Sequence, residues 1–161
     1  MTYGIYVLTA RYKTRINGMI ASWVSQVSYA PPLVLVAVHP NRYTHELIEK
    51  SNAFALHLLR KDQKDFLERF KGPQPGAKFK SIDWVEGASG CPILKDSLGF
   101  IECRVIEKYT PGNHTLYVGQ VLSGRLHFSE DPLNTSDYGG VYLGKFGQVQ
   151  GRRKFQPQEY I

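Results

Sequence analysis

The chain has 161 residues, a formal net charge of +6 and an aromatic content of 12%. This length fits one domain with a sizeable core, and the aromatic content excludes a largely disordered chain. No apolar run approaches the ~18 residues that a membrane-spanning helix needs, and no charged stretch precedes an apolar one at the N-terminus, so neither a span nor a signal peptide is predicted. We therefore expect a cytoplasmic protein without a membrane partner.

Six strands are predicted from alternating or continuous apolar patterns, and two helices are predicted from helical spacing. The strands are expected at residues 4–10, 19–28, 33–38, 54–59, 98–109 and 115–126. The first helix is expected to start at Asn41 as its N-cap and to end at Ser51-Asn52, and the second to span residues 62–70. Residues 72–90 read as a loop, and a last aromatic segment follows at 138–146.

Turn residues separate these elements. Asn17-Gly18 predicts a turn because both residues tolerate positive φ. Pro31-Pro32 interrupts the second strand, and residues 111–113 (Pro-Gly-Asn) predict a hairpin between the last two strands. Short strands joined by hairpins, with few helices, favour a mainly β, antiparallel barrel over a parallel α/β sheet. We expect one domain over residues 1–161, with a core at about 3–146 and a tail at 147–161.

The positive charge is spread over small clusters rather than gathered on one helical face. The sequence lacks RNP and zinc-finger patterns, so the charge is better matched by a ligand that carries phosphate than by nucleic acid. A basic barrel that binds nucleic acid is the remote alternative. The two cysteines, Cys91 and Cys103, form no C-x-x-C pair and have no histidine at ligand spacing, which predicts buried thiols and no metal site.

The stretch from Asn17 to Thr44 carries the most chemistry. The turn at residues 40–44 (Pro-Asn-Arg-Tyr-Thr) follows an apolar strand and opens a helix, where backbone N–H groups and the helix dipole favour an anion. Arg42 could bind a phosphate through charge-assisted bonds, with the side chains of Asn41 and Thr44 beside it. The same turn also reads as an ordinary capped helix with an exposed arginine.

The strand before this turn is rich in small residues. Gly18, Ala21 and Ser22 would let a planar ring approach the main chain, whose N–H and C=O groups could then contact the edge of the ring. Trp23 could stack on such a ring, or it could belong to the core or to a dimer interface. No G-x-G-x-x-G motif follows a strand and no P-loop motif occurs, so neither of those nucleotide sites is predicted.

The order of these segments resembles the flavin reductase-like, FMN-binding split-barrel family. The resemblance is carried by residues 3–10, 16–38, 39–48, 54–59 and 90–122. It implies a six-stranded antiparallel Greek-key barrel with short flanking helices, and a homodimer that binds flavin near the subunit interface. It also implies an NAD(P)H:flavin oxidoreductase that holds FMN, with FAD as the alternative flavin.

The resemblance also implies a set of site residues. Those that would line the isoalloxazine and the ribityl chain are Asn17, Gly18, Met19, Ile20, Ala21, Ser22 and Trp23. Gln26 would lie near the ribityl chain or the phosphate, and the phosphate would be held by His39, Asn41, Arg42 and Thr44.

His114, in a hairpin of the family's type, would lie on the nicotinamide side of the flavin. Its near-neutral pKa would suit proton exchange, although a turn histidine facing solvent is the plainer interpretation. Ile20 and Gln26 stand where many members have threonine and serine, as in members associated with rubredoxin or flavodiiron electron chains. The electrons would pass to free flavin or to a separate acceptor protein, and a flavin-binding electron-transfer module without NAD(P)H activity is the alternative.

Overall fold

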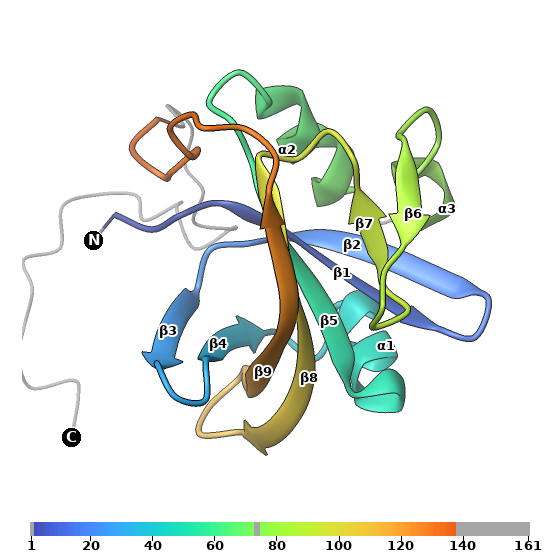
Figure 1. The fold of residues 1–161 in the computed structure, drawn as a ribbon. Helices are drawn as coiled ribbons and strands as arrows, with labels where there is room; N and C mark the ends of the chain where they lie inside the picture. The colour runs from blue at the N-terminus through green and yellow to red at the C-terminus, as the bar shows by residue number, and fades with distance from the viewer. Residues whose placement is uncertain (1, 73–74, 138–161) are drawn as a thin grey trace, which may run out of the picture.

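The computed structural model describes residues 2–72 and 75–137, so the segment predicted at 138–146 and the tail lie outside the described residues (Figure 1). Within them, the main sheet has seven antiparallel strands in the order β2-β1-β5-β8-β9-β4-β3, and β6 and β7 form a separate hairpin. The main strands are β1 (Tyr6–Tyr12), β2 (Arg15–Ala21), β3 (Val24–Ser28), β4 (Leu33–Val38), β5 (Ala53–Leu58), β8 (Gly99–Tyr109) and β9 (Thr115–Leu126).

The barrel closes at a corner that the sequence pattern did not reveal. The strand predicted at 19–28 is divided at Ser22 and Trp23, so that β2 pairs with β1 while β3 pairs with β4. These two segments are the opposite edges of the sheet order, joined through Ser22 and Trp23. The pairing of β3 with β4 continues to Trp23, whose carbonyl accepts a hydrogen bond from Ala37 N–H at 3.0 Å. The mainly β class is confirmed, but the prediction of six strands was wrong because one predicted strand serves both edges.

The turn predicted at Asn17-Gly18 is also wrong. Those residues lie inside β2, where Asn17 pairs with Ala10 and Gly18 with Thr9. The chain reverses earlier, next to Lys13, whose φ is 56°. Tertiary packing explains why glycine stands at position 18: a Cβ there would lie 2.6 Å from the Phe70 ring.

We expect the Gly18→Ala variant to lose about 1–3 kcal/mol of unfolding free energy, because its methyl group would overlap the Phe70 ring. Chemical denaturation measures the loss. The double variant Gly18→Ala/Phe70→Leu should cost less than the sum of the two single changes, because the smaller side chain makes room. Gly112→Ala, where a Cβ meets nothing within 4 Å, is the matched control. Additive losses in the double variant would contradict the overlap.

Three helices lie around the barrel in the described part of the chain: α1 (Tyr43–Ser51), α2 (Lys64–Lys71) and α3 (Pro75–Lys78). Figure 1 shows α1 at one end of the barrel and α2 at the other. Both faces of β1 are buried, since Leu8 belongs to a cluster with α1 residues and Val7 to a cluster with α2 residues. The two clusters therefore lie on opposite sides of β1, with α1 packed against β1 itself and α2 packed against the neighbouring β2.

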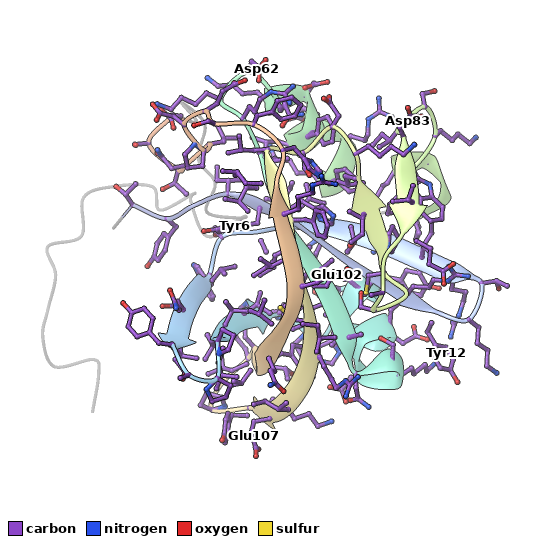
Figure 2. The ribbon with its side chains drawn as sticks, in the orientation of Figure 1. Tyr6, Tyr12, Asp62, Asp83, Glu102 and Glu107 are labelled. Carbon is purple, nitrogen blue, oxygen red and sulfur yellow. The ribbon has the colours of Figure 1, made fainter. Side chains whose placement is uncertain are left out.

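The hairpin of β6 (Trp84–Glu86) and β7 (Pro92–Leu94) lies within and just beyond the segment predicted as a loop. Its connecting loop is tied to the main sheet by Glu102, labelled in Figure 2. The carboxylate of Glu102 accepts hydrogen bonds from the Ser89 hydroxyl at 2.6 Å and the Ser123 hydroxyl at 2.8 Å. Cys91 and Cys103 are free and buried, which confirms the prediction of buried thiols.

His57 is a core residue that joins three strands. Its Nδ1–H donates to the Val7 carbonyl at 3.0 Å, and its Nε2 accepts from Leu94 N–H at 3.1 Å, so both ring nitrogens are used in the neutral form. Complete burial lowers the pKa of His57 from 6.5 to about 4. The folded protein therefore binds this proton less readily than the unfolded chain does.

Acid should destabilise the protein through His57. Above the unfolded pKa of 6.5 the stabilisation is fully present, and it should fall by about 3 kcal/mol as pH drops toward the folded pKa of about 4. Unfolding free energy measured across this window in wild type and in His57→Gln checks the effect. The variant should be less stable at neutral pH yet show a shallower pH dependence. Equal slopes in the two proteins would contradict it.

Candidate functional site

Three loops bring four of the predicted site residues together at one end of the barrel. Trp23 comes from the corner between β2 and β3, His39 and Arg42 come from the turn between β4 and α1, and His114 comes from the β8–β9 hairpin. The ring centroids of Trp23 and His114 are 4.8 Å apart, and those of His39 and His114 are 5.0 Å apart with their planes nearly perpendicular. Trp23 remains 47% exposed, so the indole offers a flat surface.

A hydrogen bond at one ring nitrogen of His114 leaves the other nitrogen available as an acceptor. Its Nδ1–H donates to Asn113 Oδ1 at 2.8 Å, which leaves Nε2 as the basic nitrogen of the neutral ring. Partial burial lowers the pKa of His114, and the nearby His39 and Arg42 lower it further. The imidazole is therefore mostly neutral at pH 7, with an acceptor at Nε2.

His39 shapes the turn that carries Arg42. The His39 carbonyl accepts from Arg42 N–H at 3.0 Å, and His39 Nδ1 accepts from Asn41 N–H at 3.2 Å. The prediction that Asn41 caps the helix was wrong: Arg42 is the N-cap residue, with no side-chain capping bond. Because main chain and imidazole hold the turn, the side chains of Asn41 and Arg42 stay exposed. Among the described residues, Arg42 has no ion-pair partner.

Asn17 and Thr44 form a buried pair beneath this turn. Asn17 Nδ2 donates to Thr44 Oγ1 at 2.8 Å, and Asn17 is only 3% exposed. Across the described side chains, Asn17 Oδ1 is the one buried polar atom without a hydrogen-bond partner. Such an orphaned acceptor is costly unless water or a ligand supplies a donor. The Thr44 hydroxyl already accepts the bond from Asn17.

The other predicted residues of β2 differ in what they can offer. The side chains of Ile20 and Ala21 belong to the core clusters, so only their main chain is free to contact a ligand. Gly18 also has only its main chain to offer, because the Phe70 ring occupies the space where a Cβ would lie. Met19 is half-buried and packs against the core, and Ser22 is buried at the corner. On β3, the exposed Gln26 donates to the Ser28 carbonyl at 3.3 Å.

Lys78 is a site residue that the sequence reasoning missed. It lies at the end of α3, is only 6% exposed, and donates from Nζ to the Gly18 carbonyl at 2.9 Å. Burial lowers the pKa of Lys78 to about 8, and the charge of Arg42 contributes. Lys78 and Lys80 both fall in the segment 72–90 that was predicted as a loop, and no local pattern distinguishes the buried lysine from the exposed one.

The chemistry of the site is cationic and aromatic. The charge of Arg42 acts on both Lys78 and His114, and His39 acts on His114 as well. The described residues contain no group of three or more His, Cys, Asp or Glu side chains arranged to hold a metal ion. The helices in that part of the chain are all too short or too polar to cross a bilayer.

Comparison with known proteins points to one family. The family model for the flavin reductase like domain matches residues 1–142. The FMN reductase (NADH) SmoA of Agrobacterium fabrum is 33% identical over 91% of this chain and 81% of its own length. The diflavin flavoprotein A 1 of Synechocystis is 35% identical over 79% of this chain, which corresponds to only 23% of that longer protein.

A solved structure with the same fold comes from Streptomyces globisporus. Its NADH:FAD oxidoreductase SgcE6 superimposes with a TM-score of 0.78 at 28% identity, covering 83% of this chain and 81% of the other. The same protein has also been described in complex with NAD and FAD fragments.

Proposed function

The chain belongs to the flavin reductase-like family, and on this basis we propose that it is an FMN-binding oxidoreductase that uses NAD(P)H to reduce flavin. The observation that carries the proposal is the convergence of Trp23, His114 and Arg42 from three separate loops onto one surface. FAD is the alternative flavin, as in the name of the Streptomyces enzyme. Either nicotinamide nucleotide fits a cationic site of this kind.

The residues present fit a flavin. Arg42 would hold the terminal phosphate by charge-assisted bonds, supported by the start of α1, a helix of nine residues. Asn17 Oδ1, which has no donor among the residues that the structure describes, would accept a hydrogen bond from a polar group of the flavin. The main chain of residues 17–23 would line the ring and the ribityl chain. Bound FMN would supply the redox chemistry by accepting a hydride from the nicotinamide.

His114 would handle protons and orientation beside the ring. Because Asn113 fixes the Nδ1–H, the lone pair of Nε2 is available to accept a proton or a hydrogen bond. Burial and the nearby His39 and Arg42 lower the pKa of His114, which favours the neutral ring with Nε2 as an acceptor. Trp23, next to it, would offer an apolar face that shields one side of the reacting rings from water.

The electrons would leave through a diffusible flavin or a separate acceptor protein.

We propose a homodimer, because β3 is an edge strand with Val27 half-exposed, and further exposed apolar side chains lie on β8 and β9 at Ile106, Leu122 and Leu126. Apolar surface of this kind favours an interface. Two free, buried thiols are consistent with a reducing cytoplasm.

One alternative is a flavin-binding electron-transfer module without NAD(P)H activity. The match to a quarter of a diflavin flavoprotein favours it, because there the domain is one part of a longer chain. The alternative shares the fold and the flavin contacts, and differs only in whether NAD(P)H reacts.

The decisive experiment is a spectrum and a mass of the cofactor released from the purified protein. We expect a yellow protein with FMN absorption that bleaches when NADH or NADPH is added. A yellow protein that responds to neither nucleotide would favour the electron-transfer module. A colourless protein that binds neither added FMN nor added FAD would refute the proposal.

A further inference from the structure

Two side chains of α1 are hydrogen-bonded to two side chains of β9. His45 Nε2 and Thr115 Oγ1 share a hydrogen bond at 2.9 Å. One turn further along α1, the carboxylate of Glu49 accepts a hydrogen bond from the Tyr117 hydroxyl at 2.8 Å. Residues four apart on a helix share a face, as do residues two apart on a strand, so the two bonds follow one another along the same pair of facing surfaces. We call these two bonds the α1–β9 clamp.

The strand side of the clamp is buried, and its acidic group is paired. Thr115 is 5% exposed and Tyr117 is 1% exposed. Lys108 of β8 donates to the second oxygen of Glu49 at 2.7 Å, and this hydrogen bond lowers the pKa of Glu49. Glu49 is therefore a carboxylate at neutral pH and accepts hydrogen bonds from both strands. The clamp ties α1 to the β8–β9 pair by side chains alone.

The clamp lies between two parts of the candidate site. α1 starts directly after Arg42, and β9 starts directly after His114. Among the described residues, the one side-chain hydrogen bond of hairpin residues 110–114 runs from His114 to Asn113, inside the hairpin itself. The position of the imidazole relative to the turn at Arg42 therefore depends on how the first residue of β9, Thr115, is held.

Main-chain pairing does not connect this residue to α1. Thr115 lies opposite Val38, the last residue of β4, and that pairing places the strand within the sheet. The hydroxyl of Thr115 points instead to His45, on the helix that follows the turn. The side-chain bond thus adds a link between hairpin and helix that the sheet does not supply.

We propose, resting on the flavin function above, that the hydrogen bond between His45 and Thr115 positions His114 for its reaction. The bond holds the β8–β9 hairpin against α1, so that the His114 ring keeps its contacts with Trp23 and His39. His45 and Thr115 act through His114 and are positioning residues. A displacement of about 1 Å is enough to slow a reaction that depends on a placed acceptor.

The variants that test this remove one bond from either side. Thr115→Val keeps a branched side chain suited to a strand but removes the hydroxyl, and Thr115→Ser restores the hydroxyl. His45→Ala removes the other partner. Ser123→Ala is the matched control, because it deletes a hydroxyl that donates to Glu102 at 2.8 Å toward the other end of the same strand.

The first measurement uses the flavin-free full chain and needs no activity. The ring centroids of His114 and Trp23 are 4.8 Å apart, so their ring protons should give NMR cross-relaxation peaks. These peaks, identified by their loss in His114→Ala, should persist in wild type, Thr115→Ser and Ser123→Ala. They should disappear in Thr115→Val and in His45→Ala. Peaks of equal intensity in wild type and Thr115→Val would overturn the inference.

The second measurement follows flavin bleaching by NADH and NADPH in the FMN-loaded protein at saturating nucleotide. Thr115→Val and His45→Ala should react about tenfold more slowly, with FMN affinity within about twofold of wild type. Thr115→Ser and Ser123→Ala should react within about twofold of wild type. The double variant His114→Ala/Thr115→Val should be no slower than His114→Ala, because no imidazole is left to position. Losses that multiply in the double variant would show that Thr115 does not act through His114.

The outcomes separate this inference from the function on which it rests. If wild type oxidises NAD(P)H and Thr115→Val does so at the same rate, the positioning role is overturned while the proposed function stands. If FMN-loaded wild type does not react with either nucleotide, the proposed function fails, and the inference fails with it because it concerns that reaction.

Discussion

The His114→Ala variant is expected to oxidise NAD(P)H about 100-fold more slowly than wild type at saturating nucleotide, with FMN affinity within about threefold. The physical reason is the position of the ring, which stands 4.8 Å from Trp23 with Nδ1 bonded to Asn113 and Nε2 left as an acceptor. Removing the ring removes that acceptor, while the groups proposed to hold the phosphate remain. Stopped-flow measurement of flavin bleaching by NADH and by NADPH gives the rate.

Two control variants sharpen this result. Asn113→Ala keeps the imidazole but removes the acceptor that orients Nδ1–H, so an intermediate loss of rate is expected. His127→Ala removes a histidine whose Nδ1 is bonded to the Ser97 carbonyl, and it should retain the wild-type rate. If His114→Ala also retains that rate, His114 has no part in the reaction with NAD(P)H, and the electron-transfer alternative gains support.

The Arg42→Ala variant should bind FMN between about 10-fold and 100-fold more weakly, and riboflavin within about twofold of wild type. Arg42 is exposed at the start of α1 and has no ion pair in the described part of the chain, so its guanidinium is available to a phosphate. Riboflavin lacks that phosphate, so its affinity should not change when the guanidinium is removed. Fluorescence titration of both flavins against the flavin-free protein measures the two affinities.

Arg42→Lys and Arg104→Ala serve as comparison variants for Arg42→Ala. The lysine keeps the charge but loses the two-pronged geometry, so FMN affinity should fall to an intermediate value. Arg104 is exposed on β8, and its removal tests whether any lost positive charge gives the same effect. Equal losses for FMN and riboflavin in Arg42→Ala would refute the phosphate role of this side chain.

Much of the fold could be predicted because the signals are local. The apolar run Leu33–Val38 became β4, and the alternating segments before and after the 111–113 turn became β8 and β9. Phe66, Leu67 and Phe70 share a buried face of α2, as their helical spacing predicted. Each of these patterns reflects a repeat of two or 3.6 residues within one element, and such a repeat needs no knowledge of the rest of the chain.

The errors in the predicted fold arise where contacts distant in sequence override local preference. Asn17-Gly18 has the composition of a turn, but pairing with β1 and packing against Phe70 hold it extended. The break between β2 and β3 cannot be recognised from the local sequence either. Apolar and polar residues alternate in the same way in a strand that bends and in a strand that continues. Only the need to close the sheet decides that the chain changes partners at Ser22 and Trp23.

The sequence by itself determined the family, the mainly β class and most of the residues proposed to contact flavin, because the order of several weak motifs is a property of the chain. The tertiary structure decided which of those side chains are available: it buries Asn17 and Thr44 as a pair and leaves Arg42 exposed. It also added Lys78, bonded to a carbonyl 60 residues away in sequence. The charge, pKa and partners of a buried cation depend on burial and distance in space, which local patterns do not encode.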